Sequence, residues 1–267
     1  MNPIADVREF PARQDHGPQA PGAAPAAANP WPLVELRRYT LHPGRRDDLI
    51  ALFEREFIES QEALDMQVLL HAREPAAPNR FVWFRGFRDL PSRAPALQAF
   101  YGGPVWQAHR EAANATMVDS DDVHLLREAA PGSGFAVPSW RPSIHAMAPE
   151  AIIDVTLHHF AAPVDAELLA FFADEIAPVA RNCGARILAS YVTDPGPNEF
   201  PRLPVHGGRH VFVWVAAFDG AAAHAQARVA FECSVRWREV TVELARRTSA
   251  PTERHRLAPA VRSLVRG

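Results

Sequence analysis

The chain contains 267 residues, of which 48% are apolar, and its 28 basic and 31 acidic side chains leave a formal net charge of −3. The length and apolar content allow one large domain or two small ones with a hydrophobic core. The near-neutral charge excludes binding to nucleic acid through bulk positive charge, and no apolar run approaches the roughly 20 residues that cross a bilayer. Charged residues also interrupt the start of the chain, where a signal peptide would need apolar ones, so we expect a cytoplasmic protein.

Two segments contain too much proline and glycine for regular structure. Residues 1–32 are rich in Ala, Pro and Gly and lack apolar periodicity, which predicts a disordered tail. A second break covers residues 130–149, where Pro131, Pro138 and Pro142 oppose a helix or strand. This linker separates a first half, residues 33–129, from a second half, residues 150–267.

The first half begins with an alternating strand over residues 33–41. A Pro43-Gly44 turn then leads to a helix with apolar residues at helical spacing, from Leu49 to Phe57. The elements that follow are strands at 66–73 and 80–87, a short helix at 95–100, a helix from Pro104 and a strand at 123–127.

The second half is predicted to follow the same order. Its first strand covers residues 152–160, and Asp165 can cap the helix that follows. The later elements are strands at 186–193 and 210–218, helical segments to about residue 246 and a weak last strand at 257–264.

The two halves also share a register of aromatic residues. The segment Phe81-Val82-Trp83 reappears 131 positions later as Phe212-Val213-Trp214, and the same offset relates Phe100 to Phe231 and Trp106 to Trp237. The shared order, βαββαβ, is the ferredoxin-like plan. We therefore predict an α+β fold in which two tandem ferredoxin-like repeats place their open sheet faces together, as an intramolecular dimeric α/β barrel that encloses a ligand.

Three motifs in this sequence resemble bacterial proteins of the NIPSNAP family: VELRRYTLHPG at 34–44, FYGGPVW at 100–106 and NEFPRLPV at 198–205. The resemblance covers about residues 33–265 and implies tandem NIPSNAP domains of the dimeric α+β barrel superfamily. It does not imply one reaction. That superfamily includes cofactor-free monooxygenases, haem enzymes, isomerases and proteins with no known chemistry.

Three polar residues alternate on the first strand, and we take them as candidate catalytic residues. Glu35, Arg37 and Tyr39 share one face, and we expect the apolar face to lie under the helices, which would direct these three into the barrel. They either form an internal salt bridge closed by Tyr39, or Arg37 holds an anionic or enolate oxygen while Tyr39 transfers a proton.

His158 is the candidate general base of the second half. An alignment of Leu36 with Leu157 places Thr156, His158 and Phe160 opposite the three polar residues, so His158 should face the barrel and His159 should face away. Its alternatives are a haem ligand or a hydrogen-bonded core histidine.

Aromatic and neighbouring polar residues are the candidate ligand-binding residues. Trp83 and Trp214 are expected to line or seal the barrel, with Arg85 sharing the alternation of Trp83. Trp106 and His109 lie at helical spacing on one helix. The alternative for all of these residues is ordinary core packing.

Three functions remain open at this stage. The leading hypothesis is a protein that binds a small apolar or aromatic ligand in the barrel and acts as a cofactor-independent oxygenase or isomerase. The second is haem binding through a histidine, and the third is a non-catalytic interaction protein. We expect no metal ion and no resident cofactor other than haem in the second case, and a homo-oligomer is compatible with each.

Overall fold

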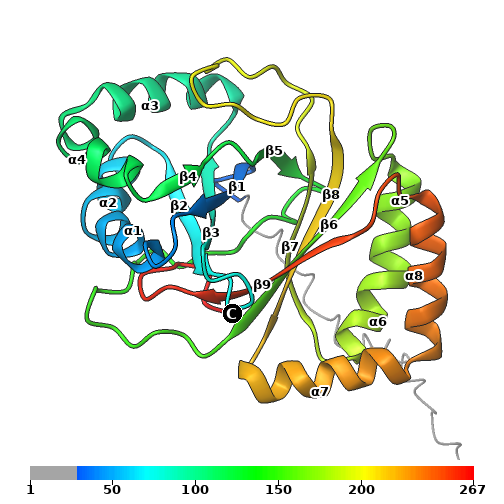
Figure 1. Cartoon of the computed structure of the whole chain (residues 1–267). Helices are drawn as coiled ribbons and strands as arrows, with labels where there is room; N and C mark the ends of the chain where they lie inside the picture. Colours follow the sequence, from blue (N-terminus) through cyan, green and yellow to red (C-terminus); the bar gives the residue numbers. More distant parts are fainter. Residues whose placement is uncertain (1–28) are drawn as a thin grey trace, which may run out of the picture.

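The computed structural model describes residues 29–267, so residues 1–28 of the predicted tail lie outside the described part. The helices and strands of each half follow one another as predicted (Figure 1). The first half contains β1 (Leu33–Leu41), α1 (Arg46–Leu52), the π-helical turn η1 (Phe53–Phe57), α2 (Ile58–Glu62), β2 (Gln67–Arg73), β3 (Arg80–Phe87), α3 (Leu90–Gly102), α4 (Pro104–Asn114), β4 (Met117–Asp119) and β5 (Val123–Glu128). The second half contains β6 (Ile152–Phe160), α5 (Ala166–Phe171), the π-helical turn η2 (Phe172–Ile176), α6 (Ala177–Asn182), β7 (Arg186–Thr193), β8 (His210–Phe218), α7 (Gly220–Cys233), α8 (Val235–Arg247) and β9 (Glu253–Pro259).

Three elements differ from the prediction. The short strand β4 was not predicted, and α3 begins five residues before the helix expected at 95–100 and ends two residues after it. The last strand, β9, begins four residues earlier than the expected strand at 257–264. Its first four residues, Glu253 to Arg256, are all polar, because one face of this strand borders a polar group of side chains inside the barrel end and the other borders a cavity under the helices. A strand with polar residues on both faces has no alternation to detect.

The strands close into a barrel of the α+β class. The sheet order is β3-β2-β9-β6-β8-β7-β5-β1, and β1 pairs back to β3 in antiparallel register, with β4 attached outside the ring of eight. The helices of the first half cover one side of this barrel and those of the second half cover the other (Figure 1). Within residues 29–267, no helix is both long and apolar enough to span a bilayer.

The side of the sheet that faces the barrel interior is opposite to the predicted one. Val34 and Leu36 of β1 pack inside with Leu157 of β6 and Val213 of β8, and all four are fully buried. Eight strands enclose a space just wide enough for side chains, and aliphatic residues fill it together with the rings of Phe84, Phe135 and Tyr191. The prediction that the barrel encloses the polar residues was therefore wrong.

The polar and aromatic candidates consequently lie on the outer face, under the helices. Glu35, Arg37 and Tyr39 face the helices of the first half together with Trp83, and His158 and Trp214 face those of the second half. His159, expected to face away from the barrel, is the residue that points into its end. The physical reason is that a buried charged side chain needs partners, and the outer face supplies them, since Glu35 pairs there with three arginines.

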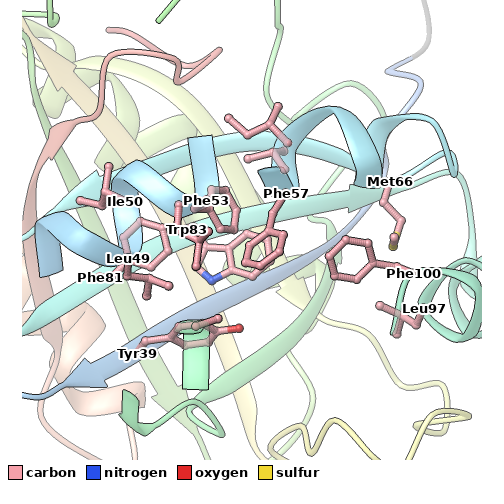
Figure 2. Close-up of a cluster of buried hydrophobic side chains, with 14 of the residues drawn as sticks. Tyr39, Leu49, Ile50, Phe53, Phe57, Met66, Phe81, Trp83, Leu97 and Phe100 are labelled. Atoms are coloured by element: carbon pink, nitrogen blue, oxygen red, sulfur yellow. The ribbon is translucent and has the colours of Figure 1, made fainter. Parts of the chain in front are cut away.

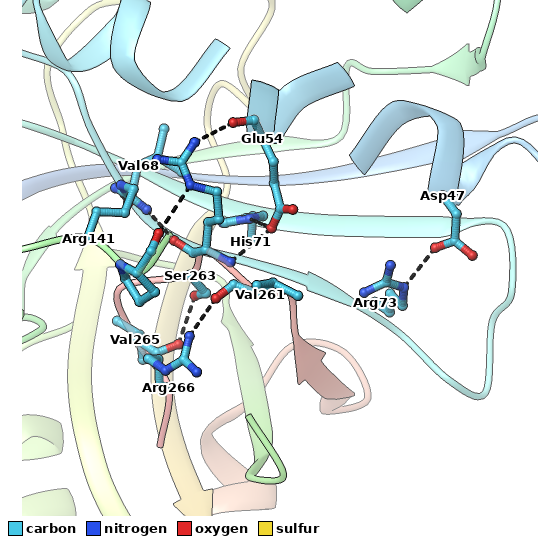
Figure 3. Close-up of polar contacts among 12 residues, drawn as sticks. Asp47, Glu54, Val68, His71, Arg73, Arg141, Val261, Ser263, Val265 and Arg266 are labelled. Atoms are coloured by element: carbon cyan, nitrogen blue, oxygen red, sulfur yellow. Dashed lines mark hydrogen bonds and ion pairs between the residues drawn. The ribbon is translucent and has the colours of Figure 1, made fainter. Parts of the chain in front are cut away.

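The linker and the C-terminal segment each contribute an apolar side chain to the barrel interior, Phe135 and Val265. Phe135 of the linker is buried among interior residues, with its ring 5.2 Å from that of Phe84, and its backbone N–H donates to the hydroxyl of Tyr191. Near the C-terminus, the Ser263 hydroxyl donates to the Val265 carbonyl oxygen. Figure 3 shows this segment beside Glu54 of η1. The Glu54 carboxylate accepts a hydrogen bond from the Arg262 backbone N–H at 2.9 Å.

A filled barrel interior predicts a large cost for removing an interior ring. Phe84→Ala should lower the free energy of unfolding by about 3–5 kcal/mol, because the packed neighbours cannot collapse fully into the space. Urea unfolding would measure this loss. Trp140→Ala, at a side chain that is 66% exposed, is the control and should change stability little. A similar, small effect of both changes would contradict a packed interior.

Candidate functional site

A buried carboxylate organises the outer face of the first-half sheet. Glu35 of β1 accepts from Arg37 at 2.9 Å and from Arg85 of β3 at 2.6 Å, and Arg93 of α3 lies 2.6 Å away. All four residues have no exposed surface. Burial alone would raise the pKa of Glu35, but the three guanidinium groups together hold it well below its usual range. One negative and three positive charges leave this cluster net positive.

The cluster supports a small aromatic cavity between sheet and helices. Figure 2 shows Tyr39 and Trp83 on the sheet facing Phe53 and Phe57 of η1. The cavity measures about 100 Å³, which is room for little more than one aromatic ring. The Tyr39 hydroxyl accepts a hydrogen bond from Arg37 Nε at 3.0 Å. Trp83 Nε1 is buried and has no hydrogen-bond partner among residues 29–267.

The ionisation of Tyr39 is set mainly by burial. Burial raises the pKa of Tyr39, and the Arg37 guanidinium opposes this shift only in part. The phenol is therefore neutral near neutral pH, so its proton is available as a hydrogen-bond donor toward the cavity.

The other predicted residues of the first half lie around this cavity. Trp106 of α4 lines it, and Arg85 lies behind it, where it also donates to Gln61 at 2.9 Å. His109 lies farther out, half-exposed, with Nε2 3.4 Å from a carboxylate oxygen of Glu56. The structure thus places Glu35, Arg37, Tyr39, Trp83, Arg85 and Trp106 in or behind one cavity.

Strand pairing corrects the alignment between the halves. Trp83 pairs with Arg37 on β1, and Trp214 pairs with Thr156 on β6. The residues that match Glu35, Arg37 and Tyr39 are therefore Asp154, Thr156 and His158, two positions earlier than predicted. The connection between β7 and β8 is longer than the one between β2 and β3, so the sequence offset between matching residues is different before and after it. An alignment of the first strands alone does not reveal this difference.

The second half contains a larger cavity at the matching position. It measures about 550 Å³ and lies between β6, β8 and β9 on one side and α7 and α8 on the other. The repeated aromatic residues Trp214, Phe231 and Trp237 line it, as Trp83, Phe100 and Trp106 line the small cavity. Thr156 and Ala216 stand where the first half has Arg37 and Arg85. Shorter side chains leave this space open.

An acid–histidine pair lies in the wall of the larger cavity. Asp154 Oδ2 is 3.0 Å from Nε2 of His224, which occupies the α7 position that matches Arg93. Asp154 Oδ1 has no hydrogen-bond partner in the described part of the chain, and the nearest guanidinium, that of Arg256, is 4.0 Å away. Arg254 also lines the cavity. None of these residues is predicted from the sequence, although the 131-residue offset relates Arg93 to His224.

His158 is held by two hydrogen bonds. Trp214 Nε1 donates to its Nε2 at 3.1 Å, and its Nδ1 lies 3.0 Å from the Thr252 hydroxyl. Burial, with smaller contributions from Arg254 and His159, lowers the pKa of His158 to about 4. This geometry matches the hydrogen-bonded core histidine among the alternatives, and a role as haem ligand would require breaking one of these bonds.

Comparisons with known proteins agree with this architecture. Residues 34–131 match the NIPSNAP family model, and no curated protein sequence matches the chain. A provisionally assigned monooxygenase from Fusobacterium nucleatum is 9% identical, with 89% of this chain and 96% of that one covered and a TM-score of 0.53. An anthrone oxidase-like protein is 13% identical, with 85% and 91% covered and a TM-score of 0.51. These two matches establish a shared fold.

A shorter match is closer in sequence. A NIPSNAP-like domain protein from Burkholderia xenovorans is 25% identical, and the match covers 41% of this chain and 95% of that protein, with a TM-score of 0.36.

Removal of the Glu35 charge should destabilise the protein strongly. Glu35→Gln leaves three buried guanidinium groups without their counter-charge, so the free energy of unfolding should fall by about 3–5 kcal/mol. Urea unfolding at neutral pH measures this change. Glu167→Gln, at a carboxylate that is 77% exposed and pairs with Arg247, should cost less than about 1 kcal/mol. If the free energy of unfolding falls equally little in both variants, Glu35 is not the counter-charge that this cluster requires.

Stability should fall as the pH drops from 6.5 to 4.5. Burial lowers the pKa of His124 to about 3 and that of His158 to about 4, from 6.5. In this range the unfolded chain binds these protons and the folded protein does not, so acid favours unfolding. The expected slope is up to about 1.4 kcal/mol per pH unit for each histidine.

A series of urea unfolding curves across this pH range measures how steeply the free energy of unfolding falls with pH. His158→Gln should reduce this slope by the contribution of one histidine, and His145→Gln, at an exposed position, should leave it unchanged. A wild-type stability that stays constant over this range would contradict the burial of these histidines in the neutral form.

Proposed function

With a NIPSNAP domain at residues 34–131 as the premise, we propose that this protein binds a small aromatic ligand between the sheet and the helices of its second half. The observation that carries the proposal is the 550 Å³ cavity, which has aromatic walls and Asp154 in its lining. One carboxylate oxygen of Asp154 has no hydrogen-bond partner among residues 29–267. This volume falls within the usual range of small-molecule sites, roughly 300–1,000 Å³.

We further propose that the second half is a diverged copy of the first, so that the chain contains tandem ferredoxin-like repeats. The strand order supports this: β5-β1-β3-β2 in the first half and β9-β6-β8-β7 in the second both place the first strand between the fourth and the third. The matched aromatic residues in the two cavities support it independently.

The walls of the large cavity favour a ligand with a flat apolar body and an acidic group. Trp214, Phe231 and Trp237 offer ring faces and edges for stacking. Arg254 and Arg256 approach from β9 and would stabilise a negative charge on the ligand. Aromatic hydroxy compounds and aromatic ketones with an acidic C–H group combine these properties.

The chemistry that these groups support is proton abstraction. Asp154 Oδ1 would accept a proton from the ligand while His224 holds the other carboxylate oxygen in place, and Arg254 would stabilise the resulting enolate or phenolate. Such an anion either takes the proton back at another atom, which is isomerisation, or reacts with dioxygen without a cofactor. For an anthrone, the second route consumes one dioxygen and releases one water as the ring carbon becomes a ketone.

The small cavity of the first half is a second candidate for the site. The unpartnered Trp83 Nε1 and the Tyr39 hydroxyl, held by Arg37, could both donate hydrogen bonds to a ligand oxygen there. Its size limits it to a ligand of about one ring. The substitutions Asp154→Asn and Tyr39→Phe distinguish the two candidate sites, because each changes a residue of only one cavity.

Asp154→Asn tests the proposed base with almost no change in shape. With anthrone as the probe, oxygen uptake and quinone formation should fall about 10²–10⁴-fold, because an amide cannot accept the proton. Quenching of tryptophan fluorescence by anthrone should remain within a few-fold of wild type, because the aromatic walls are intact.

Two further variants serve as controls. Glu232→Gln, at the rim of the same cavity, and Tyr39→Phe, in the small cavity, should retain the activity. Loss of activity in Tyr39→Phe with full activity in Asp154→Asn would move the site to the first half. Binding without turnover in the wild type would reject the oxygenase and retain the ligand site, whereas no binding would reject both.

A further inference from the structure

A group of histidine and acidic residues occupies one end of the barrel, away from both cavities under the helices. Alternation on the strands directs Arg38, His124 and His159 into this end, whereas their neighbours face the helices. Asp122 lies just before β5 and His206 lies in the connection between β7 and β8. Neither proposed ligand cavity uses these five residues.

Three of these side chains converge on one point. The nearest ligand atoms of Asp122, His124 and His206 all lie within 4.8 Å of one another. Asp122 Oδ1 is 2.8 Å from His206 Nε2, and the ring centroids of His124 and His206 are 4.8 Å apart. Two atoms bound to one tetrahedral ion at about 2.0–2.1 Å lie about 3.3 Å apart, so side-chain rotation would have to bring the more distant of these atoms closer together.

The unpaired atom in this group is what points to a ligand. His124 is only 2% exposed, and its Nε2 has no hydrogen-bond partner anywhere in residues 29–267. A buried imidazole nitrogen without a partner is costly unless something binds it. One ligand atom of this imidazole lies within 4.8 Å of the ligand atoms of Asp122 and His206, so an ion bound among the three side chains would supply a partner for the ring.

We propose that Asp122, His124 and His206 bind a divalent first-row transition-metal ion such as zinc. Two imidazoles and one carboxylate suit such an ion, and three protein ligands leave a position for water or for a further ligand. Asp122 and His206 each keep 22% of their side-chain surface exposed, which gives the ion access from solvent.

The surrounding groups suit a bound cation. Arg38 donates to Asp122 Oδ1 at 2.8 Å, as an outer partner that orients a ligating carboxylate. Its own positive charge is offset by Glu253, with which it also pairs. The Arg80 guanidinium also lies 4.0 Å from Asp122 Oδ2. One further carboxylate, that of Glu74, lies 3.0 Å from His255 Nδ1 and lowers the electrostatic cost of a cation here.

Titration of the chelator-treated full-length protein with cobalt(II) and zinc tests this site. The wild type should take up one equivalent of cobalt with visible d–d absorption bands, and zinc should displace it. His124→Ala and Asp122→Asn should each lower the affinity by about 100-fold or more. His145→Ala, which removes an exposed histidine elsewhere, should bind like the wild type.

Two further measurements guard against unfolded variants. His206→Ala changes a partly exposed loop residue and should fold while losing the metal, and zinc should raise the melting temperature of the wild type only. The proposal is overturned if the wild type binds no cobalt beyond the level of His124→Ala, or if the three substitutions leave stoichiometric binding intact.

Discussion

The narrow interior of the closed eight-stranded barrel is the constraint on which the rest of this structure depends. Val34, Leu36, Leu157 and Val213 occupy that space, and Phe135 of the linker adds a further ring. Because no room remains inside for long polar side chains, such residues lie either on the outer face, beneath the helices, or at the barrel end. The cavities under the helices and the histidine group at the end are consequences of this one limit.

The two halves use the same outer face in different ways. In the first half, Arg37 and Arg85 fill the space around a single buried carboxylate and leave a small aromatic cavity. In the second half, Thr156 and Ala216 take their places, and the remaining carboxylate is paired with a histidine. The shorter side chains at these two positions therefore account for the larger volume, and one Asp154 oxygen is left without a hydrogen-bond partner among residues 29–267.

The barrel end is where the two halves share polar residues. Arg38 of β1 pairs with Glu253 of β9, and His206 from the connection between β7 and β8 reaches Asp122 beside β5. Such contacts between residues far apart in the sequence couple the position of one half to that of the other. A ligand held at this end would therefore strengthen the association of the halves in addition to any chemical role.

The sequence by itself determined the order of the elements, most of their bounds and the aromatic register, because apolar periodicity and turn residues act over short distances. It also identified Glu35, Arg37 and Tyr39 as a group, since alternate strand residues share a face. Only the tertiary structure decided which face is inside, because alternation cannot distinguish the two sides of a sheet buried on both. Contacts such as Asp154 with His224, or Asp122 with His206, depend on strand pairing and loop length, so only the folded chain brings these residues together.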